Sequence, residues 1–186
     1  YVDSTPVLFL TGQVKRADFA SKRGVRQFGA QENDIVSMAK PVTKYAETIL
    51  EPEEVLYHLQ KALYLANHGR KGPVWLDIPL DVQSAEIDEK KLTEFHPEAE
   101  DLEYTIEVEK SDKTVEIEEA VGKTIEMLKE AKRPLILVGH GVTASGAMET
   151  LRKLQQTLKS PVVCTWRTLD AFDDDDPYFF GSPGLQ

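Results

Sequence analysis

The stretch Gly72-Pro73-Val74-Trp75-Leu76-Asp77-Ile78-Pro79 indicates the fold class more clearly than any other part of the chain. It is a short apolar run bounded by prolines, which is typical of a buried strand. A second apolar run, residues 6–12, ends in Gly12 and predicts another strand that leads into a loop. The segment between the two runs then decides how these strands are connected.

Residues 52–68 predict a helix between the two strands. Pro52 suits a first helical turn, acidic residues beside it favour the positive end of the helix dipole, and Gly69 suits the stop. One apolar face is predicted, formed by Val55, Leu59, Ala62, Leu63 and Ala66. A short helix in residues 31–38 and an edge strand or extended segment in 39–45 are also expected. Strand, helix and strand at this spacing predict an α/β unit with a parallel sheet.

The last third of the chain repeats this alternation. Ile117, Val121, Ile125 and Leu128 are spaced as one helix face, and Pro134 precedes a predicted strand at 135–138. After a glycine turn comes a helix with four residues expected inward and a strand at 162–164; the four are Met148, Leu151, Leu154 and Leu158. The chain is therefore predicted to be α/β, with Rossmann-like parallel sheets flanked by helices.

Three segments are expected along the chain. Residues 1–83 form the first α/β unit, residues 84–113 an acidic linker, and residues 114–186 the second unit. Each unit has about two strong strands, whereas doubly wound domains usually have about five or six. Both units are therefore expected to be incomplete, and the chain to be a fragment of a larger protein.

Composition excludes several classes of function. A net charge of -10 argues against nucleic acid as a partner, because binding phosphates needs a basic patch. No apolar run reaches the roughly 18 residues that span a bilayer, and the first residues lack a basic region typical of a signal peptide. The single cysteine, Cys164, lies in an apolar run and is expected to be a small buried residue. A cytoplasmic protein without a membrane partner is predicted.

The residues themselves give only weak chemical signals. Gly139-His140-Gly141 lies between a predicted strand and helix, where it forms either a structural turn or a contact to a phosphate or flavin. Asp77 and Asp81 follow at the end of a strand, either as turn residues or as groups that act on a substrate or metal. The acidic run 173–176 is expected to be a solvated loop, and no metal site is predicted. His58 is expected to be structural.

A series of short motifs resembles one enzyme family. In order, they are Thr11-Gly12-Gln13-Val14, Ala30-Gln31-Glu32, Thr43-Lys44, Ala66-Asn67-His68-Gly69-Arg70-Lys71-Gly72-Pro73-Val74 and Asp77-Ile78-Pro79-Leu80-Asp81-Val82-Gln83. This series resembles the second half of the pyrimidine-binding domain of thiamine-diphosphate-dependent enzymes of the acetolactate synthase type. The region around residues 133–139 and 176–184 resembles the start of the central domain.

The resemblance implies what the parent protein does. It implies a three-domain homo-oligomer with thiamine diphosphate and Mg²⁺, which decarboxylates a 2-oxo acid and joins the product to a second carbonyl. The glutamate that activates the cofactor and the motif that holds Mg²⁺ belong to other parts of such a parent, so this chain alone is expected to be inactive. Gln31 matches a residue near the thiazolium and substrate, and Gln13 one near the active centre. Arg70, Gly139 and Gly141 match residues that contact FAD where flavin is kept.

Several residues depart from the family pattern. Ala30 stands where acetolactate synthases have Phe, Leu80 where they have Lys, and His140 interrupts a triple glycine. The segment Thr165-Trp166-Arg167 replaces a small, apolar one. These changes leave open another 2-oxo acid decarboxylase as the parent. A nucleotide- or flavin-binding module and a non-catalytic subunit remain as alternatives of other classes.

Overall fold

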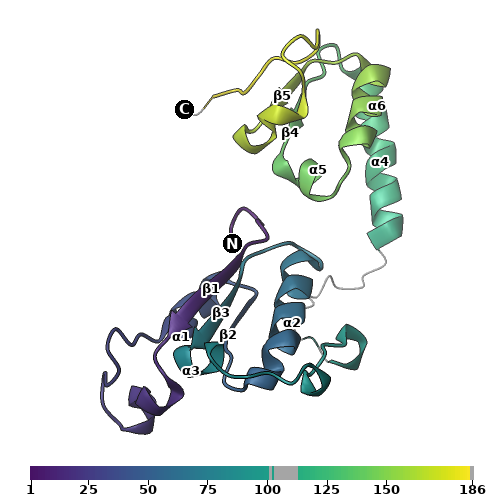
Figure 1. Cartoon of the computed structure of the whole chain (residues 1–186). Helices are drawn as coiled ribbons and strands as arrows, with labels where there is room; N and C mark the ends of the chain where they lie inside the picture. The colour runs from purple at the N-terminus through teal and green to yellow at the C-terminus, as the bar shows by residue number, and fades with distance from the viewer. Residues whose placement is uncertain (101, 103–112, 185–186) are drawn as a thin grey trace. The chain divides into compact units, whose positions relative to one another are not determined.

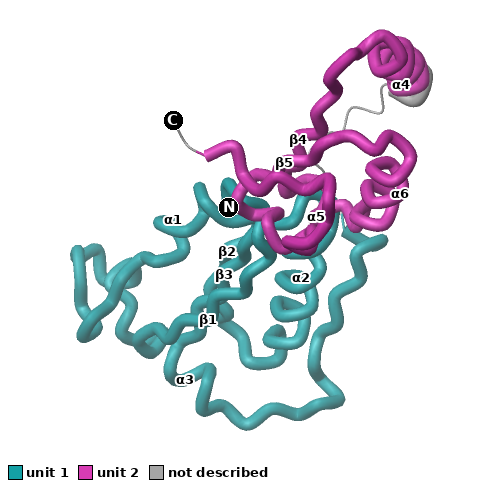
Figure 2. The backbone as a smooth tube through the Cα atoms, turned by 90° about the horizontal axis from the view of Figure 1, so that it is seen from above, with its two compact units in different colours: residues 1–108 teal, residues 109–186 magenta. Residues whose placement is uncertain are grey.

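The computed structural model describes residues 1–100, 102 and 113–184 (Figure 1). The chain divides into two compact units, residues 1–108 and 109–186 (Figure 2). Each unit contains a small open parallel sheet accompanied by helices. The predicted α/β, Rossmann-like fold class is thereby confirmed. The predicted bounds of the domains and linker stay a prediction.

The sheet of the first unit has three parallel strands in the order β1-β3-β2. These are β1 (Leu8–Gln13), β2 (Tyr45–Thr48) and β3 (Val74–Pro79). In this register Thr11 and Thr48 both lie beside Asp77. The central strand carries the core, since Val74 and Leu76 are fully buried. The carboxyl ends of all three strands meet at one edge, which is where parallel sheets place ligands.

Helix α2 (Val55–Asn67) follows a 3-10 turn at Pro52–Glu54 and packs on the sheet. Its buried residues include Ala62, Leu65 and Ala66, which join Val74 and Leu76 in one core cluster. The prediction was wrong for Leu63, which is 52% exposed. The buried stripe is centred on positions 58, 62 and 65, and residue 63 lies about 100° round the helix from residue 62.

The short elements before β2 differ from the expected ones. Helix α1 (Ile35–Ala39) begins later than predicted, with the Asp34 carboxylate accepting a hydrogen bond from the Ser37 N–H as the N-cap. The strand expected at 39–45 begins only at Tyr45, because Pro41 lies in a 3-10 turn at Lys40–Val42. A further helical turn, α3 (Leu80–Gln83), directly follows β3.

Part of the acidic segment packs against α2. Phe95 is buried, and its ring lies 5.8 Å from Tyr57 and 5.6 Å from Tyr64, measured between centroids. Lys61 Nζ donates a 2.6 Å hydrogen bond to the Glu100 carboxylate. Within the predicted acidic linker, Phe95 and Glu100 are therefore held on α2 by an aromatic contact and an ion pair. Residues 101 and 103–109 lie outside the described part of the chain.

The second unit has a two-stranded parallel sheet, β4 (Ile136–Val138) and β5 (Val162–Cys164). Its helices are α4 (Lys113–Glu130), α5 (His140–Ala144) and α6 (Met148–Leu158), followed by a 3-10 segment at Trp166–Ala171. The core joins strand and helix residues, namely Val138, Leu151, Val162, Cys164, Ala171 and Phe172. Residues 178–181 add backbone hydrogen bonds along the free side of β5.

Two predicted apolar faces of the second unit are exposed in part. Ile117, Val121 and Ile125 of α4 are each about half exposed, and Leu154 of α6 is 45% exposed. Gln155 is buried in place of Leu154, because its side-chain amide donates to the Asp176 carboxylate at 2.9 Å. Asp176 also accepts from the Tyr178 N–H, so the predicted solvated loop was wrong at this residue.

Among the described residues, no helix is both long and apolar enough to cross a membrane.

Candidate functional site

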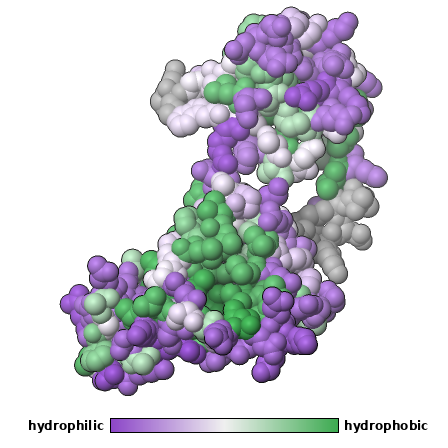
Figure 3. Space-filling model, in the orientation of Figure 1, coloured by the Kyte–Doolittle hydropathy of each residue, from purple (hydrophilic) through white to green (hydrophobic). Residues whose placement is uncertain are grey.

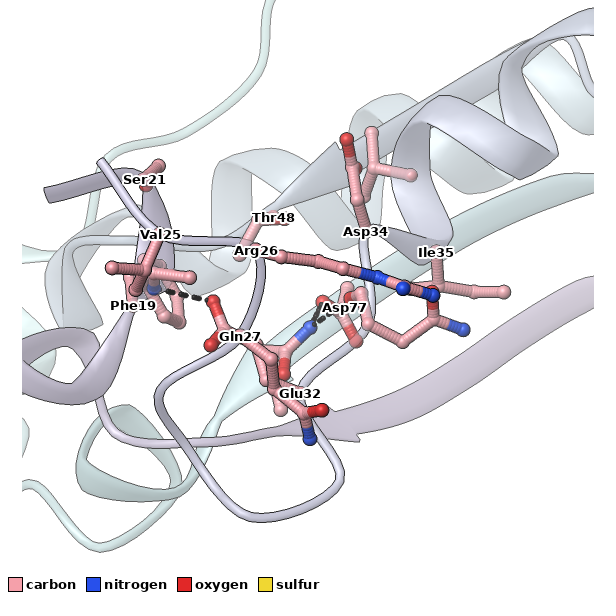
Figure 4. Close-up of a pocket in the computed structure, with 14 residues that line it drawn as sticks. Phe19, Ser21, Val25, Arg26, Gln27, Glu32, Asp34, Ile35, Thr48 and Asp77 are labelled. Carbon is pink, nitrogen blue, oxygen red and sulfur yellow. Dashed lines mark hydrogen bonds between the residues drawn. The ribbon is translucent and has the colours of Figure 1, made fainter. Parts of the chain in front are cut away.

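A pocket of about 600 Å³ lies in the first unit, at the carboxyl ends of its strands (Figure 4). Gln13, Thr48 and Asp77 come from the ends of β1, β2 and β3. The rest of the wall comes from the segment between β1 and α1 and from the start of α1, and includes Phe19, Arg26, Glu32, Asn33 and Asp34. Because three strand ends and one long connection converge here, this pocket is the candidate site.

Asp77 is the buried centre of the pocket floor, with 1% of its surface exposed. Its two carboxylate oxygens accept a 2.7 Å hydrogen bond from the Thr11 hydroxyl and a 3.0 Å bond from the Gln13 amide. Trp75 Nε1 donates in turn to the Thr11 hydroxyl oxygen at 2.9 Å. The parallel register that pairs Thr11 with Asp77 creates this chain of bonds. Asp77 therefore serves to fix the strand ends and the Gln13 side chain.

Gln13 holds the sheet and the long connection together. Its Nε2 also donates to the Asn33 carbonyl at 2.7 Å, and its Oε1 accepts from the Val14 N–H at 2.9 Å. Both ends of the amide are thus engaged, so the side chain has one defined orientation. Gln13 lines this pocket, and its predicted role near a cofactor stays a prediction.

Glu32 organises the connection between β1 and α1. Its carboxylate accepts hydrogen bonds from the backbone N–H groups of Ala20, Phe28 and Gly29 at 2.6, 3.1 and 3.2 Å. These bonds lower the pKa of Glu32 below its ordinary value, and the bond from the Ala20 N–H has the largest effect. Gly29 is needed for close packing, because a Cβ there would lie 2.8 Å from both methyl carbons of Val14.

Gln31 lies beside the pocket without lining it. Its backbone is in the left-handed region, with φ at 64°, and its side chain is exposed. The adjacent residues Glu32 and Asn33 line the pocket instead. The structure therefore brings Gln13 to the pocket but leaves Gln31 outside it, and the predicted catalytic role of Gln31 stays a prediction.

The three residues predicted for flavin lie in different units. Arg70 is exposed and donates from Nε to the Ser4 hydroxyl at 2.8 Å. Gly139 precedes α5 as its N-cap, and Gly141 lies in that helix. Neither glycine has a positive φ, and a Cβ on either would meet nothing within 4 Å. Nothing in the described packing requires glycine at these positions, and the predicted contacts of Arg70, Gly139 and Gly141 to FAD stay a prediction.

Other candidates from the sequence have structural partners. Asp81 is paired with Arg16 at 2.7 Å; burial would raise the pKa of Asp81, but hydrogen bonds from Arg16 lower it. The His58 ring bonds the Tyr45 hydroxyl at 2.6 Å. Cys164 is buried, which raises the pKa of its thiol. Within the described ranges, no cluster of three His, Cys, Asp or Glu residues could hold a metal ion.

Comparison with known proteins shows the family to which this chain is similar. Residues 121–186 match the family model of the thiamine pyrophosphate enzyme central domain. The whole chain is 36% identical over 185 residues to a probable acetolactate synthase large subunit of Methanocaldococcus jannaschii, covering 100% of this chain and 29% of that protein. It is 37% identical to a glyoxylate carboligase of Escherichia coli O157:H7, over 99% of this chain and 28% of the relative.

A third relative is again an acetolactate synthase. Acetolactate synthase isozyme 2 large subunit of Escherichia coli K12 is 34% identical, over 99% of this chain and 30% of that protein. The chain therefore belongs to the thiamine-diphosphate-dependent enzyme family of the acetolactate synthase type. It spans less than a third of the length of the curated relatives that it matches.

Sequence reasoning missed several pocket residues. Arg26, Asn33, Asp34 and Thr48 line the pocket and were not singled out. The rule that ligands gather at the carboxyl ends of parallel strands drew attention to Asp77 and would also have indicated Thr48. No comparable signal identifies Arg26 or Asn33, because they lie in an irregular segment whose path depends on the bonds made by Glu32.

Proposed function

We propose that the full protein containing this chain decarboxylates a 2-oxo acid and joins the remaining carbon unit to a second carbonyl compound. The observation that carries this proposal is the similarity to acetolactate synthases and a glyoxylate carboligase over essentially the whole chain. The pocket at the strand ends supports it, because its polar wall suits a small polar substrate.

Thiamine diphosphate, when bound, would supply an electron sink for the loss of carbon dioxide. This chain would contribute the pocket wall, in which Asp77 and Gln13 are held rigidly by hydrogen bonds. We place the Mg²⁺ ligands in other parts of the parent. We further propose Gln31 as a residue near the substrate, and Arg70, Gly139 and Gly141 as contacts for FAD. We also propose that the full protein is a cytoplasmic homo-oligomer.

A related 2-oxo acid decarboxylase is the second candidate. Ala30 and Leu80, which replace Phe and Lys of acetolactate synthases, are both exposed at the surface of the first unit. They change side-chain size and charge on the segments that flank the pocket. These substitutions favour a substrate other than that of acetolactate synthase, while the hydrogen bonds of the pocket floor are unaffected by them.

The test uses the full-length protein with thiamine diphosphate and Mg²⁺. Pyruvate and glyoxylate are offered separately, and carbon dioxide and the organic product are quantified. Carbon dioxide and a condensed product in equal amounts support the proposal. Carbon dioxide with only an aldehyde product would support the decarboxylase alternative. No carbon dioxide from either acid would overturn both, and yellow colour without turnover would favour the flavin-binding module.

A further inference from the structure

Arg26 is the only cationic side chain among the described residues that line the pocket. Its side chain extends across the pocket toward Ile35 (Figure 4). Throughout residues 1–100, 102 and 113–184, it has no hydrogen-bond or ion-pair partner. An arginine with five N–H donors beside a cavity, and with none of them engaged, is available to an anionic ligand.

Unlike Arg26, each carboxylate of the pocket already has hydrogen-bond partners. Asp77 accepts from Thr11 and Gln13, and Glu32 accepts from three backbone N–H groups. Asp34 accepts from the Ser37 N–H at 3.1 Å, and hydrogen bonds from the side chain and backbone of Ser37 lower its pKa. Each acidic group therefore has donors in the fold itself. None of these hydrogen bonds to the pocket carboxylates uses an N–H donor of Arg26.

The backbone that carries Arg26 is held in place. The Glu32 carboxylate binds the N–H groups on both sides of residue 26, at Ala20 and at Phe28 and Gly29. The tight contact between Gly29 and Val14 fixes the end of this loop on β1. Because these contacts set the path of the backbone, the guanidinium is directed over the pocket at a small cost in ordering on binding.

We propose that Arg26 binds the carboxylate of the substrate, and so selects an anionic 2-oxo acid over a neutral carbonyl compound. The guanidinium matches a carboxylate in shape and charge and forms paired N–H···O bonds with it. This inference rests on the proposed function for the identity of the substrate. Its physical basis, an unpaired arginine at a pocket whose acids are all engaged, is independent of the reaction.

The test compares Arg26→Gln with Arg23→Gln in the full-length protein. Arg23 is a matched control on the same loop: its guanidinium lies 3.7 Å from the centre of the Phe28 ring, and it does not line the pocket. Two quantities are measured, the KM for the 2-oxo acid and the dissociation constant of oxamate, a non-reacting carboxylate of similar size. Thermal unfolding of each variant shows that the fold is retained, and Arg26→Lys tests whether charge alone suffices.

We expect Arg26→Gln to raise both constants about tenfold or more, the usual effect of losing a hydrogen bond to a charged group. Arg23→Gln should leave both unchanged, and Arg26→Lys should fall between them. Equal oxamate binding by Arg26→Gln and the wild type would overturn the role of Arg26. Oxamate binding that depends on Arg26 without turnover of pyruvate or glyoxylate would keep this role and refute the proposed function instead.

Discussion

Lys44 is a buried lysine whose ammonium group is bound by the end of a helix. Its Nζ donates to the carbonyl oxygens of Leu65 and His68, the second at 2.6 Å. These groups belong to the last turn of α2 and the residue after it, where carbonyls lack partners within the helix. Burial lowers the pKa of Lys44. Gly72 leaves room for the lysine stem, because a Cβ there would lie 2.9 Å from Lys44 Cδ.

We predict that Lys44→Met loosens the segment after α2. The substitution keeps an apolar stem of similar length but leaves the two carbonyls without their donor, at a cost of about 1–3 kcal/mol. Trypsin should then cleave after Arg70 and Lys71 on the order of tenfold faster, because cleavage follows the population of the open segment. Lys40→Met, at an exposed site, is the control. Equal cleavage rates in the two variants would show that Lys44 does not hold this segment.

His58 gives the first unit a dependence of stability on pH. Its ring is nearly buried beside Tyr45, and burial lowers its pKa below 6.5, although Glu54 at 3.7 Å and Glu47 act in the opposite direction. The unfolded chain therefore binds this proton more readily than the folded chain. The resulting stability is complete above pH 6.5 and is lost as the pH falls from 6.5 through the folded pKa.

We predict that the free energy of unfolding falls between pH 7 and pH 5 with a contribution that His58→Gln removes. A single proton changes this free energy by at most about 1.4 kcal/mol per pH unit. Urea unfolding of wild type and variant across this range gives the difference in slope. Gln keeps an amide next to Tyr45 but does not titrate. Identical slopes would mean that other groups cause the acid sensitivity.

At the residue scale, the candidate site was only partly predictable. Asp77 was found because it lies at the end of a strand whose apolar pattern is clear, and the ends of parallel strands converge. Gln13 was selected through a family motif. Gln31 was selected through a family motif, and the structure places it outside the pocket wall, in a left-handed conformation. Arg26 was missed because an irregular loop has no periodicity. Its position results from the bonds of Glu32 to groups up to 12 residues away.

At the element scale, α2 is stabilised by the acidic segment that follows the sheet. Phe95 packs between Tyr57 and Tyr64, and its N–H donates to the Gln60 side chain at 2.8 Å. Lys61 bonds Glu100 and lies 5.9 Å from the centre of the Phe95 ring. This segment is otherwise mostly exposed. One aromatic ring and one ion pair thus hold it against the side of α2.

We predict that Phe95→Ala releases this segment from α2. Removing a buried phenylalanine costs about 3–5 kcal/mol in well-packed cores, which exceeds the stability of a short surface segment. Hydrogen exchange should become faster at residues 89–100 while the amides of β3 stay protected. Ile87→Ala, at a residue 43% exposed on the same segment, should change neither. Unchanged exchange at 89–100 would show that the ion pair of Glu100 is sufficient.

Elements with a complete pattern of their own were predicted well. The proline-bounded run of β3 and the capped, amphipathic α2 follow directly from local sequence. Strand β2 was placed too early, because its few residues carry little pattern and Pro41 belongs to the turn before it. The spacing of apolar residues correctly predicted α4 as a helix with one apolar face. Whether that face is buried depends on the elements that pack against it, which the sequence of the helix does not specify.

At the scale of the whole molecule, each sheet ends, within the described residues, in at least one strand with a free side. In the first unit β1 lies at the edge of its sheet and pairs with β3 on one side only, within the described residues. Phe9 and Leu10 of this strand are 42% and 57% exposed. Figure 3 shows apolar residues gathered on the face of the first unit that carries β1. An exposed apolar edge strand is a surface on which further strands add.

We predict that the isolated 186-residue chain self-associates through the edge of β1. Light scattering after size exclusion should give a mass that rises with concentration. Leu10→Lys should shift the chain toward the monomer, because a charge on an edge strand opposes the addition of another strand. Leu63→Lys, at a residue on α2 that is 52% exposed, is the control and should leave the mass unchanged. A wild type that remains a monomer at all concentrations would refute the prediction. If Leu63→Lys disperses the chain as well as Leu10→Lys does, then β1 is not the specific associating surface, and general hydrophobicity becomes the better explanation.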